Sequence, residues 1–276
     1  MAESLEEFES FAIELAREAG KIINDASGVT SSKSIETKQS YADLVTETDK
    51  GVESFLFEEL RKRFPSHKFI GEENVAEQEK REFTEEPTWI IDPVDGTLNF
   101  VHTLPFVAVC IGLAIKKECV VGVVYCPFLD HLYHARKGAG AFLNGTKLQV
   151  RPSASLKESL ICTELGNDRD DKKRDAVFKN LQAIGWQCHG IRMMGSAALN
   201  ICAVASGQVN LYYEWGLHCW DMAAALVILT EAGGCVFDPT GGKFDLFSRK
   251  ILASSSEKLA VELSKALVVQ LDLPRD

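Results

Sequence analysis

Residues 89–100 read WIIDPVDGTLNF, a stretch that predicts a buried strand followed by an acidic turn. Its apolar start predicts a strand that presents Asp92 at its exposed end, and Pro93, which has no backbone N–H, is expected to stop the ladder. Asp95 follows three positions after Asp92, and Gly96 begins a tight turn with the threonine after it. Two carboxylates, a hydroxyl and free backbone N–H groups thus fall within six residues. Such a group suits hard, oxygen-seeking cations and the phosphate that accompanies them.

Two similar patterns and one structural alternative compete with this interpretation. Phosphatases that form an aspartyl-phosphate carry Asp-x-Asp-Gly-Thr, but here two residues separate the carboxylates. The Ca²⁺ loop of an EF-hand needs oxygen ligands at alternating positions, and Val94 interrupts them. A strand that ends in an acidic turn, without any ligand, remains compatible with this stretch alone.

Further segments elsewhere in the chain combine polar groups with apolar runs. They are Leu44–Asp49 (LVTETD), Gly71–Asn74 (GEEN), Arg192–Ala198 (RMMGSAA), Tyr212–Asp221 (YYEWGLHCWD) and Trp220–Ala224 (WDMAA). Together with residues 89–100, and in this order, they resemble the metal-dependent, lithium-sensitive phosphatase superfamily. Within it the chain is similar to the animal-type inositol monophosphatase family over essentially its whole length.

The resemblance implies an α+β fold, a layered αβαβα sandwich of the inositol monophosphatase and fructose bisphosphatase type. It implies one catalytic domain over residues 1–276, with an N-terminal metal-binding half at 1–154 and a C-terminal α/β half at 155–276. Periodicity alone predicts less, because it identifies elements and not their layers. The predicted helices are 8–23, 48–64, 170–184, 196–206, 219–231 and 257–269, with an antiparallel meander over 106–150 and extended segments at 186–191, 209–213 and 235–237.

The resemblance also implies two to three Mg²⁺ ions in each active site. It places one ion on Glu72, Asp92 and the backbone carbonyl of Val94, and a second on Asp92, Asp95 and Asp221. A third, weaker ion is expected on Glu72 and waters. All of these ligands are hard oxygens, the class that Mg²⁺ prefers. Li⁺, which resembles Mg²⁺ in size but carries half its charge, is expected to inhibit at the second position.

Catalytic and substrate-binding roles follow from the same resemblance. The catalytic residues are Asp49, Glu72 and Thr97, and the carboxylate of Asp49 and the hydroxyl of Thr97 are expected to orient the attacking water. A threonine hydroxyl accepts from that water only if another group takes its own hydrogen bond. Lys38 matches a position near this relay. The substrate is expected to contact Asp95, Gly96, Thr97, Gly195, Ser196, Ala197, Glu214 and Asp221, with backbone N–H groups of the Gly-Thr pair on the phosphate oxygens.

Several of these residues also have purely structural interpretations. Asp49 could serve only as a helix cap, and Asp221 could stabilise the start of its own helix, a role compatible with metal binding. Glu73 is expected to be a neighbour of the ligands and not one of them. His218 and Cys219 flank the proposed ligand in sequence, and we expect them to be packed residues.

Composition and charge narrow the partners. The 276 residues carry a formal net charge of −10, which argues against broad binding to nucleic acids or anionic membranes. The acidic N-terminus lacks a basic-then-apolar signal, and the apolar runs are far shorter than the roughly 20 residues that span a bilayer. None of the eight cysteines forms a Cys-x-x-Cys pair, which favours reduced thiols over a zinc site. We therefore expect a cytoplasmic protein without a membrane or nucleic-acid partner.

Three functions remain open on these observations. The first is a Mg²⁺-dependent phosphatase that hydrolyses inositol monophosphates, acts as a homodimer and serves inositol metabolism and phosphatidylinositol signalling. The second is a phosphatase of the same superfamily for another sugar or nucleotide phosphate; a bisphosphate would need extra basic groups, and residues 195–220 offer only His218. The third is a dimeric interaction protein on a retired phosphatase fold, which the complete ligand set disfavours. The preferred isomer, the lithium affinity and any regulation stay undetermined.

Overall fold

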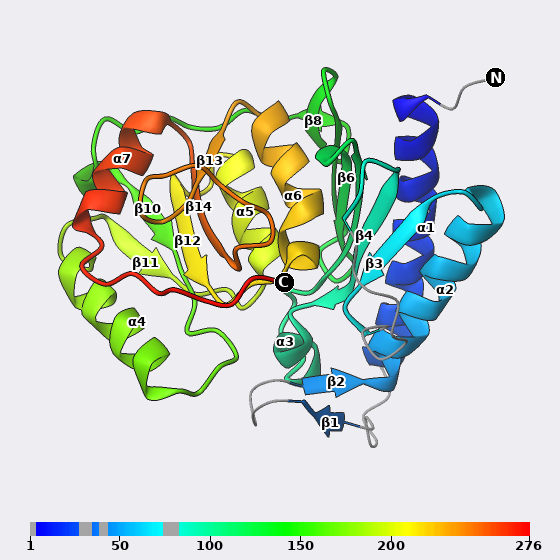
Figure 1. The fold of residues 1–276 in the computed structure, drawn as a ribbon, viewed down its shortest axis with the longest axis horizontal. Helices are drawn as coiled ribbons and strands as arrows, with labels where there is room; N and C mark the ends of the chain where they lie inside the picture. Colours follow the sequence, from blue (N-terminus) through cyan, green and yellow to red (C-terminus); the bar gives the residue numbers. More distant parts are fainter. Residues whose placement is uncertain (1–3, 28–34, 39–43, 74–82) are drawn as a thin grey trace.

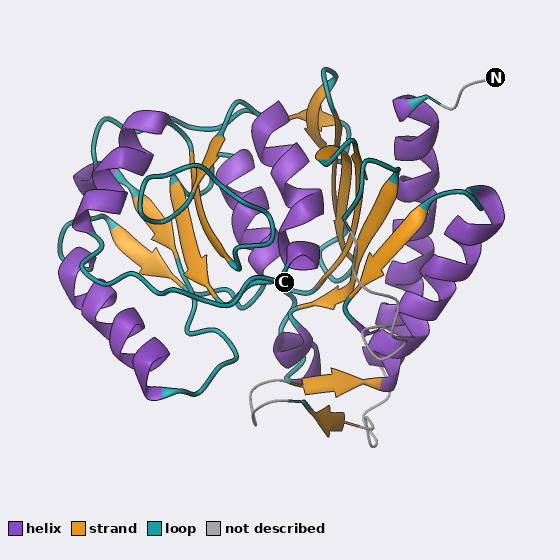
Figure 2. Ribbon diagram, in the orientation of Figure 1, coloured by secondary structure: helices purple, strands orange, loops and turns teal. Residues whose placement is uncertain are grey.

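The computed structural model describes residues 4–27, 35–38, 44–73 and 83–276, which form alternating layers of helix and sheet (Figures 1 and 2). Two helices cover the outer face of a large sheet, two more lie between it and a smaller sheet, and two cover the far side of the smaller sheet. The layered α+β sandwich expected from the resemblance is confirmed. Asn74, part of one quoted segment, lies outside the described residues.

The large sheet contains the acidic stretch and the predicted meander. Its strands, in spatial order, are β3 (Lys68–Gly71), β4 (Thr88–Asp95), β5 (Ala108–Ile115), β6 (Glu118–Cys126), β7 (His131–Arg136), β8 (Gly140–Leu143) and β9 (Thr146–Lys147). The β3–β4 pair is parallel and every later pair is antiparallel, so the predicted meander is confirmed. Every residue of β4 is buried, because helices cover both faces of the sheet.

The outer helices of this sheet are α1 (Leu5–Ser27) and α2 (Glu47–Arg63), as the apolar periodicity predicted. Their apolar faces pack with the sheet into one cluster that includes Leu15, Leu56, Trp89 and Ile111. A small two-stranded sheet, β1 (Ile35–Thr37) and β2 (Leu44–Thr46), lies just before α2 and leads into its first turn. That turn carries Asp49.

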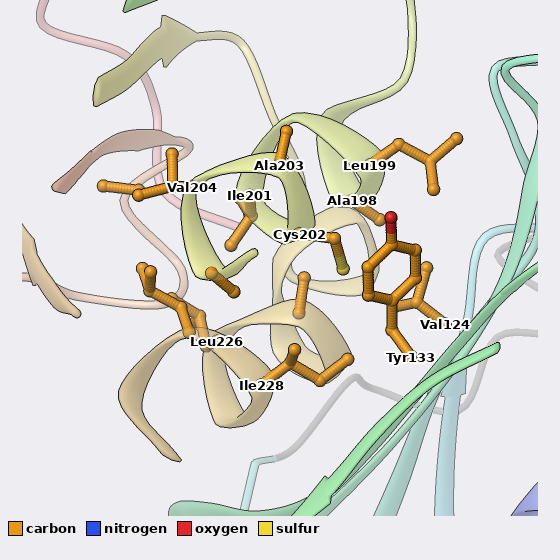
Figure 3. Packing of buried hydrophobic residues seen from close by; sticks show 14 of the residues in the cluster. Val124, Tyr133, Ala198, Leu199, Ile201, Cys202, Ala203, Val204, Leu226 and Ile228 are labelled. Atoms are coloured by element: carbon orange, nitrogen blue, oxygen red, sulfur yellow. The ribbon is translucent and has the colours of Figure 1, made fainter. Parts of the chain in front are cut away.

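The middle layer consists of α5 (Ala197–Ala205) and α6 (Cys219–Glu231), whose residues are almost all buried. A helix that is apolar on all sides needs neighbours on all sides, and the two sheets supply them. Figure 3 shows Tyr133 of the large sheet packed against Ala198 and Cys202 of α5. Helix α6 approaches closely because Gly122 faces it, where a Cβ would collide with the Ala224 carbonyl. This close approach places the second turn of α6 directly against the large sheet.

The smaller sheet lies beyond the middle helices. Its strand order is β11 (Gly190–Arg192), β10 (Leu160–Cys162), β12 (Leu211–Trp215), β14 (Lys250–Ser254) and β13 (Cys235–Phe237). Helices α4 (Asp171–Ile184) and α7 (Glu257–Ala266) lie on the outside of this layer (Figure 1). The remaining short elements are α3 (Thr97–Val101) and a 3₁₀ turn at Leu156–Glu158. Strands β10 and β14 were not predicted, because each is a short run without alternation.

Candidate active site

The acidic stretch does not end its strand where the sequence predicted. Strand β4 continues through Pro93 to Asp95, so the expected stop at the proline is wrong. The ladder with β5 shifts instead: Asp92 pairs with Cys110 and Asp95 with Ala108, which leaves one extra residue on β4. This β-bulge removes the pairing exactly where proline cannot donate. It also turns both carboxylates toward one place.

The bulge leads directly into the short helix α3 through Gly96. This residue has φ 88°, and a Cβ there would lie 2.7 Å from the Phe106 carbonyl oxygen, so the turn requires glycine. The side chain of Asn99 on α3 donates to the carbonyl oxygens of Phe106 at 2.9 Å and Met194 at 2.7 Å. These bonds join the strand end to the segment before α5. The end of β4 and the segment before α5 are therefore held together.

Two carboxylates of β4 and one from the distant helix α6 meet beside the bulge. Asp92, Asp95 and Asp221 each place one oxygen within 4.8 Å of the others, and all three side chains line one pocket of about 760 Å³. Asp221 stands in the first turn of α6 and accepts from the backbone N–H of His218 at 2.7 Å. The helix-stabilising role and a place in the acidic group are thus combined in Asp221.

The electrostatics of this group favour a bound cation. Burial, together with the charges of Glu72, Asp95 and Asp221, raises the pKa of Asp92 well above its ordinary value. Burial likewise raises the pKa of Asp221, and it raises that of Asp95 to about 6 against the hydrogen bonds from Ser196, Ala198 and Ala197. Buried like charges disfavour ionisation unless a positive charge joins them. Hard oxygen atoms in this arrangement fit a hard divalent cation.

Glu72 lines the same pocket but lies outside the tight group of three. Its carboxylate accepts from the ammonium group of Lys38 at 2.8 Å, and Lys38 also donates to Glu73 at 2.6 Å. Burial raises the pKa of Glu72 to about 7, although the ammonium group acts in the opposite direction. Glu73 therefore shares the lysine with Glu72, which agrees with its expected place beside the ligands.

Asp49 and Thr97 meet as the sequence predicted. The Thr97 hydroxyl lies 3.0 Å from Asp49 Oδ1 and 3.0 Å from the carbonyl oxygen of Val94, so its single proton has two acceptors. Asp49 is also the third residue of a capping box: it accepts from the backbone N–H of Thr46 at 3.0 Å, and from the Thr46 hydroxyl. The N-cap is thus Thr46, and Asp49 both stabilises the start of α2 and holds Thr97. Asp49 itself lies behind the pocket and does not line it.

The opposite wall of the pocket comes from α5 and β12. Asp95 accepts from Ser196 Oγ at 2.5 Å, from Ala198 N at 2.8 Å and from Ala197 N at 3.2 Å, so it sits on the first turn of α5. Ser196 is the N-cap of that helix and is 1 % exposed. Its hydroxyl is therefore already committed to Asp95.

Glu214 on β12 is the carboxylate of the same wall that faces the pocket without touching the acidic group. It accepts from the Tyr212 hydroxyl at 2.5 Å and is 7 % exposed. Burial raises its pKa to about 8, with the charge of Glu164 adding to the effect and Tyr212 and Lys173 opposing it. A carboxylate in this position can accept from hydroxyl groups of a ligand.

The pocket wall includes residues that the sequence did not single out. Glu164 accepts from the backbone N–H groups of Met194 at 2.7 Å and Gly195 at 2.8 Å, which fixes the segment before α5. Asp168, Arg169 and Arg249 also line the pocket. The count of basic groups over residues 195–220 alone missed both arginines, because they come from segments on either side of it.

Comparisons with known proteins identify the family of this chain. A model described as the inositol monophosphatase family matches residues 4–271. This match and the relatives below identify the chain as a hydrolase of phosphate monoesters. The chain belongs to the inositol monophosphatase family. It is 48 % identical to inositol monophosphatase 1 of Mus musculus over 277 aligned positions, covering 100 % of this chain and 99 % of the relative.

Solved structures give the same relationship. The extragenic suppressor protein suhB from Bartonella henselae superimposes with a TM-score of 0.85 at 32 % identity, over 94 % of this chain and 98 % of the other. An inositol monophosphatase from Anabaena (Nostoc) sp. PCC 7120 gives a TM-score of 0.80 at 32 % identity, over 98 % of both chains.

Within the described residues, no helix combines the length and apolar character needed to cross a membrane.

Proposed function

We propose that this protein is a Mg²⁺-dependent phosphatase that hydrolyses myo-inositol monophosphates to inositol and phosphate. The observation that carries the proposal is the group of Asp92 and Asp95, both buried, and the partly buried Asp221 in one pocket, in a chain of the inositol monophosphatase family. We also propose that residues 1–276 form a single catalytic domain, with the metal ligands concentrated in residues 1–154 and most of the polyol contacts in residues 155–276.

Five residues are proposed to hold the ions. Glu72, Asp92 and the Val94 carbonyl would hold one, Asp92, Asp95 and Asp221 a second, and Glu72 with waters a third. When bound, such ions lower the pKa of a water and neutralise the leaving oxygen of a phosphate ester. The carboxylates supply negative charge inside the protein. Among the described residues, Lys38 partly neutralises this charge through its bond to Glu72.

Asp49 and Thr97 are proposed to orient the attacking water. For this role the Thr97 hydroxyl donates to Asp49 and not to the Val94 carbonyl, so that its lone pair faces the water. Occupation of the Val94 carbonyl by an ion would remove the competing acceptor. The backbone N–H groups of Gly96 and Thr97 are proposed to bind the phosphate oxygens, because both residues line the pocket at the start of α3.

The polyol side is proposed to use Glu214 and the segment of Gly195, Ser196 and Ala197. Glu214 is the better supported of these, since its carboxylate is buried at the wall and keeps acceptor capacity beside its bond from Tyr212. Ser196 is proposed to act through Asp95, to which its hydroxyl already donates. Its contribution would therefore be to hold a carboxylate that touches both the ions and the sugar.

A monophosphate fits the described basic groups better than a bisphosphate. Arg249 donates one hydrogen bond to the carbonyl oxygen of Gly216 and one to that of Leu217, each at 3.4 Å. Its guanidinium group also lies 3.8 Å from the Asp276 carboxylate. Arg169 donates to the carbonyl oxygen of Gly166 at 2.6 Å. Each arginine at the pocket is thus engaged with the protein. A phosphatase for another sugar or nucleotide phosphate remains the second candidate, since these arginines do line the pocket.

The test is phosphate release from a matched panel with and without Mg²⁺. Inositol 1-phosphate, glycerol 2-phosphate, a nucleoside 2′-phosphate and fructose 1,6-bisphosphate cover the two candidates. We expect turnover that is abolished by chelation, restored by Mg²⁺ and highest on the inositol ester. Turnover unchanged after exhaustive chelation would contradict the metal role, and a preference for the bisphosphate would favour the second candidate.

Inhibition by Li⁺, dimerisation and a cytoplasmic location are proposed with the activity. Li⁺ would occupy the position of Asp92, Asp95 and Asp221 with half the charge of Mg²⁺, and activity that persists across the millimolar range of Li⁺ would count against this.

A homodimer is proposed because symmetric dimers are the commonest assemblies and the family resemblance implies one. A monomer mass in light scattering at micromolar concentration would contradict it.

A further inference from the structure

A buried lysine reaches the pocket wall from outside the acidic site. Lys173, in the first turn of α4, is 3 % exposed. Lysines are almost never buried to this extent unless a carboxylate pairs with them. Its backbone N–H donates to the capping residue Asp170 at 2.9 Å. Its ammonium group donates to Asp168 Oδ2 at 3.0 Å. The side chain is therefore fixed at both ends.

The ammonium group lies between two turns of the pocket wall. Gly166 and Gly216 have φ values of 71° and 96°, and a Cβ on either would collide with Lys173 Nζ. Gly216 follows directly after β12, the strand that carries Glu214, and a Cβ on Gly166 would lie 3.6 Å from Glu214 Oε1. The buried ammonium group of Lys173 thus lies between the turn at Gly216, which follows the strand of Glu214, and the turn at Gly166, which precedes Asp168.

Asp168 presents a further carboxylate to the pocket on this side, beside Glu164 and Glu214. It lines the pocket together with Glu214, and its side chain is 30 % exposed, so one face remains open to a ligand. Its Oδ2 is held by Lys173, which leaves Oδ1 as an acceptor. Two carboxylates on one wall repel each other unless a cation lies between them. Lys173 supplies that cation, and its charge lowers the pKa of Glu214 against the effect of burial.

We propose that Asp168, positioned by Lys173, accepts hydrogen bonds from ring hydroxyls of the substrate and so makes this pocket selective for a cyclic polyol. The proposal rests on the proposed phosphatase function and adds a residue pair to its polyol side. Asp168 is the specificity-determining residue and Lys173 the positioning residue. Neither touches the acidic group that is proposed to hold the ions, so their contribution belongs to the substrate's hydroxyl groups and not to its phosphate.

The test compares two esters that differ in their hydroxyl groups. Inositol 1-phosphate and glycerol 2-phosphate are hydrolysed by the unsubstituted chain, by Asp168→Asn and by Lys173→Met, with Lys172→Met as the matched control. Lys172 neighbours Lys173 on α4 but is exposed. We expect both variants to raise the KM for the inositol ester about tenfold, equal to about 1.4 kcal/mol. The KM for glycerol 2-phosphate and both kcat values should change less than about twofold. Lys173→Arg should recover part of the loss, because it restores the charge.

A binding measurement makes the result independent of turnover. Calorimetric titration with inositol 1-phosphate, in Ca²⁺ as a divalent ion, should show about tenfold weaker binding for both variants. Absence of turnover by the unsubstituted chain would contradict the proposed phosphatase function, while this titration would still test the pair. Unchanged binding in Asp168→Asn would overturn the proposal even if Lys173→Met failed to fold. Equal losses on both esters would also overturn it, since they would indicate a general structural role.

Discussion

Glu214→Gln separates the recognition of the polyol from the chemistry of the phosphate. In assays above pH 8, where the Glu214 side chain is ionised, the substitution removes the charge with little change in volume, and the amide oxygen can still accept from the Tyr212 hydroxyl. A hydrogen bond from a hydroxyl to a carboxylate contributes about 1.5–3 kcal/mol. Its loss should reduce the preference for inositol 1-phosphate over glycerol 2-phosphate by roughly 10–150-fold in kcat/KM. Metal dependence should change little, because Glu214 lies outside the group of Asp92, Asp95 and Asp221.

The same variant should change the pH dependence of stability in the metal-free protein. Burial raises the pKa of Glu214 from 4.5 to about 8, so this carboxyl contributes stability below its ordinary pKa that is lost as the pH rises through 8. At about 1.4 kcal/mol for each pKa unit, the titration of this one group removes about 2–3 kcal/mol between pH 5 and pH 7. The glutamine variant lacks this titration and should lose correspondingly less.

Two assays with one control test both effects. Phosphate release is measured on both esters, and denaturant unfolding in EDTA is followed by circular dichroism at pH 5 and pH 7. Glu158→Gln is the control, because Glu158 is exposed and does not line the pocket. An equal loss of activity on both esters would refute the division of roles and place Glu214 in the catalytic machinery. Parallel pH curves for the variant and the unsubstituted chain would refute the raised pKa.

Three further predictions concern the acidic side of the pocket. Asp92→Asn should reduce turnover at least about 10³-fold without unfolding the protein, since a buried ligand charge is lost at nearly constant volume; a variant that keeps most of the activity would remove Asp92 from the metal site. Thr97→Val should lower kcat about 10²–10⁴-fold with little change in KM, and Thr97→Ser should not, if the hydroxyl held by Asp49 orients the water. In EDTA, the melting temperature should fall as the pH rises through about 6 and about 7, where the raised pKa values of Asp95 and Glu72 lie, and Mg²⁺ should reverse the fall; a melting temperature that is flat or rising over this range in EDTA would contradict it.

The sequence determined the elements and most of the chemical inventory. Helix periodicity located α1 and α2, and alternating short runs located the antiparallel meander, because both signals depend only on local spacing. The carboxylates at 92, 95 and 221 lie in two short motifs and were assigned as ligands through the family resemblance; the structure brings one oxygen of each within 4.8 Å of the others. Helix and strand periodicity needs only local spacing, whereas the choice of these carboxylates as ligands depended on the resemblance.

The tertiary structure decided what no single segment contains. The bulge that carries β4 past Pro93 depends on the register with β5, and the commitment of Ser196 to Asp95 depends on how α5 meets the strand end. Asp168, which lines the pocket, and Lys173, which holds it, come from a loop and a helix that no motif marked. Sequence spacing fixes which side chains a single element presents, but distances between elements follow from packing. The close approach of α6 to the large sheet at Gly122 is one such result of packing.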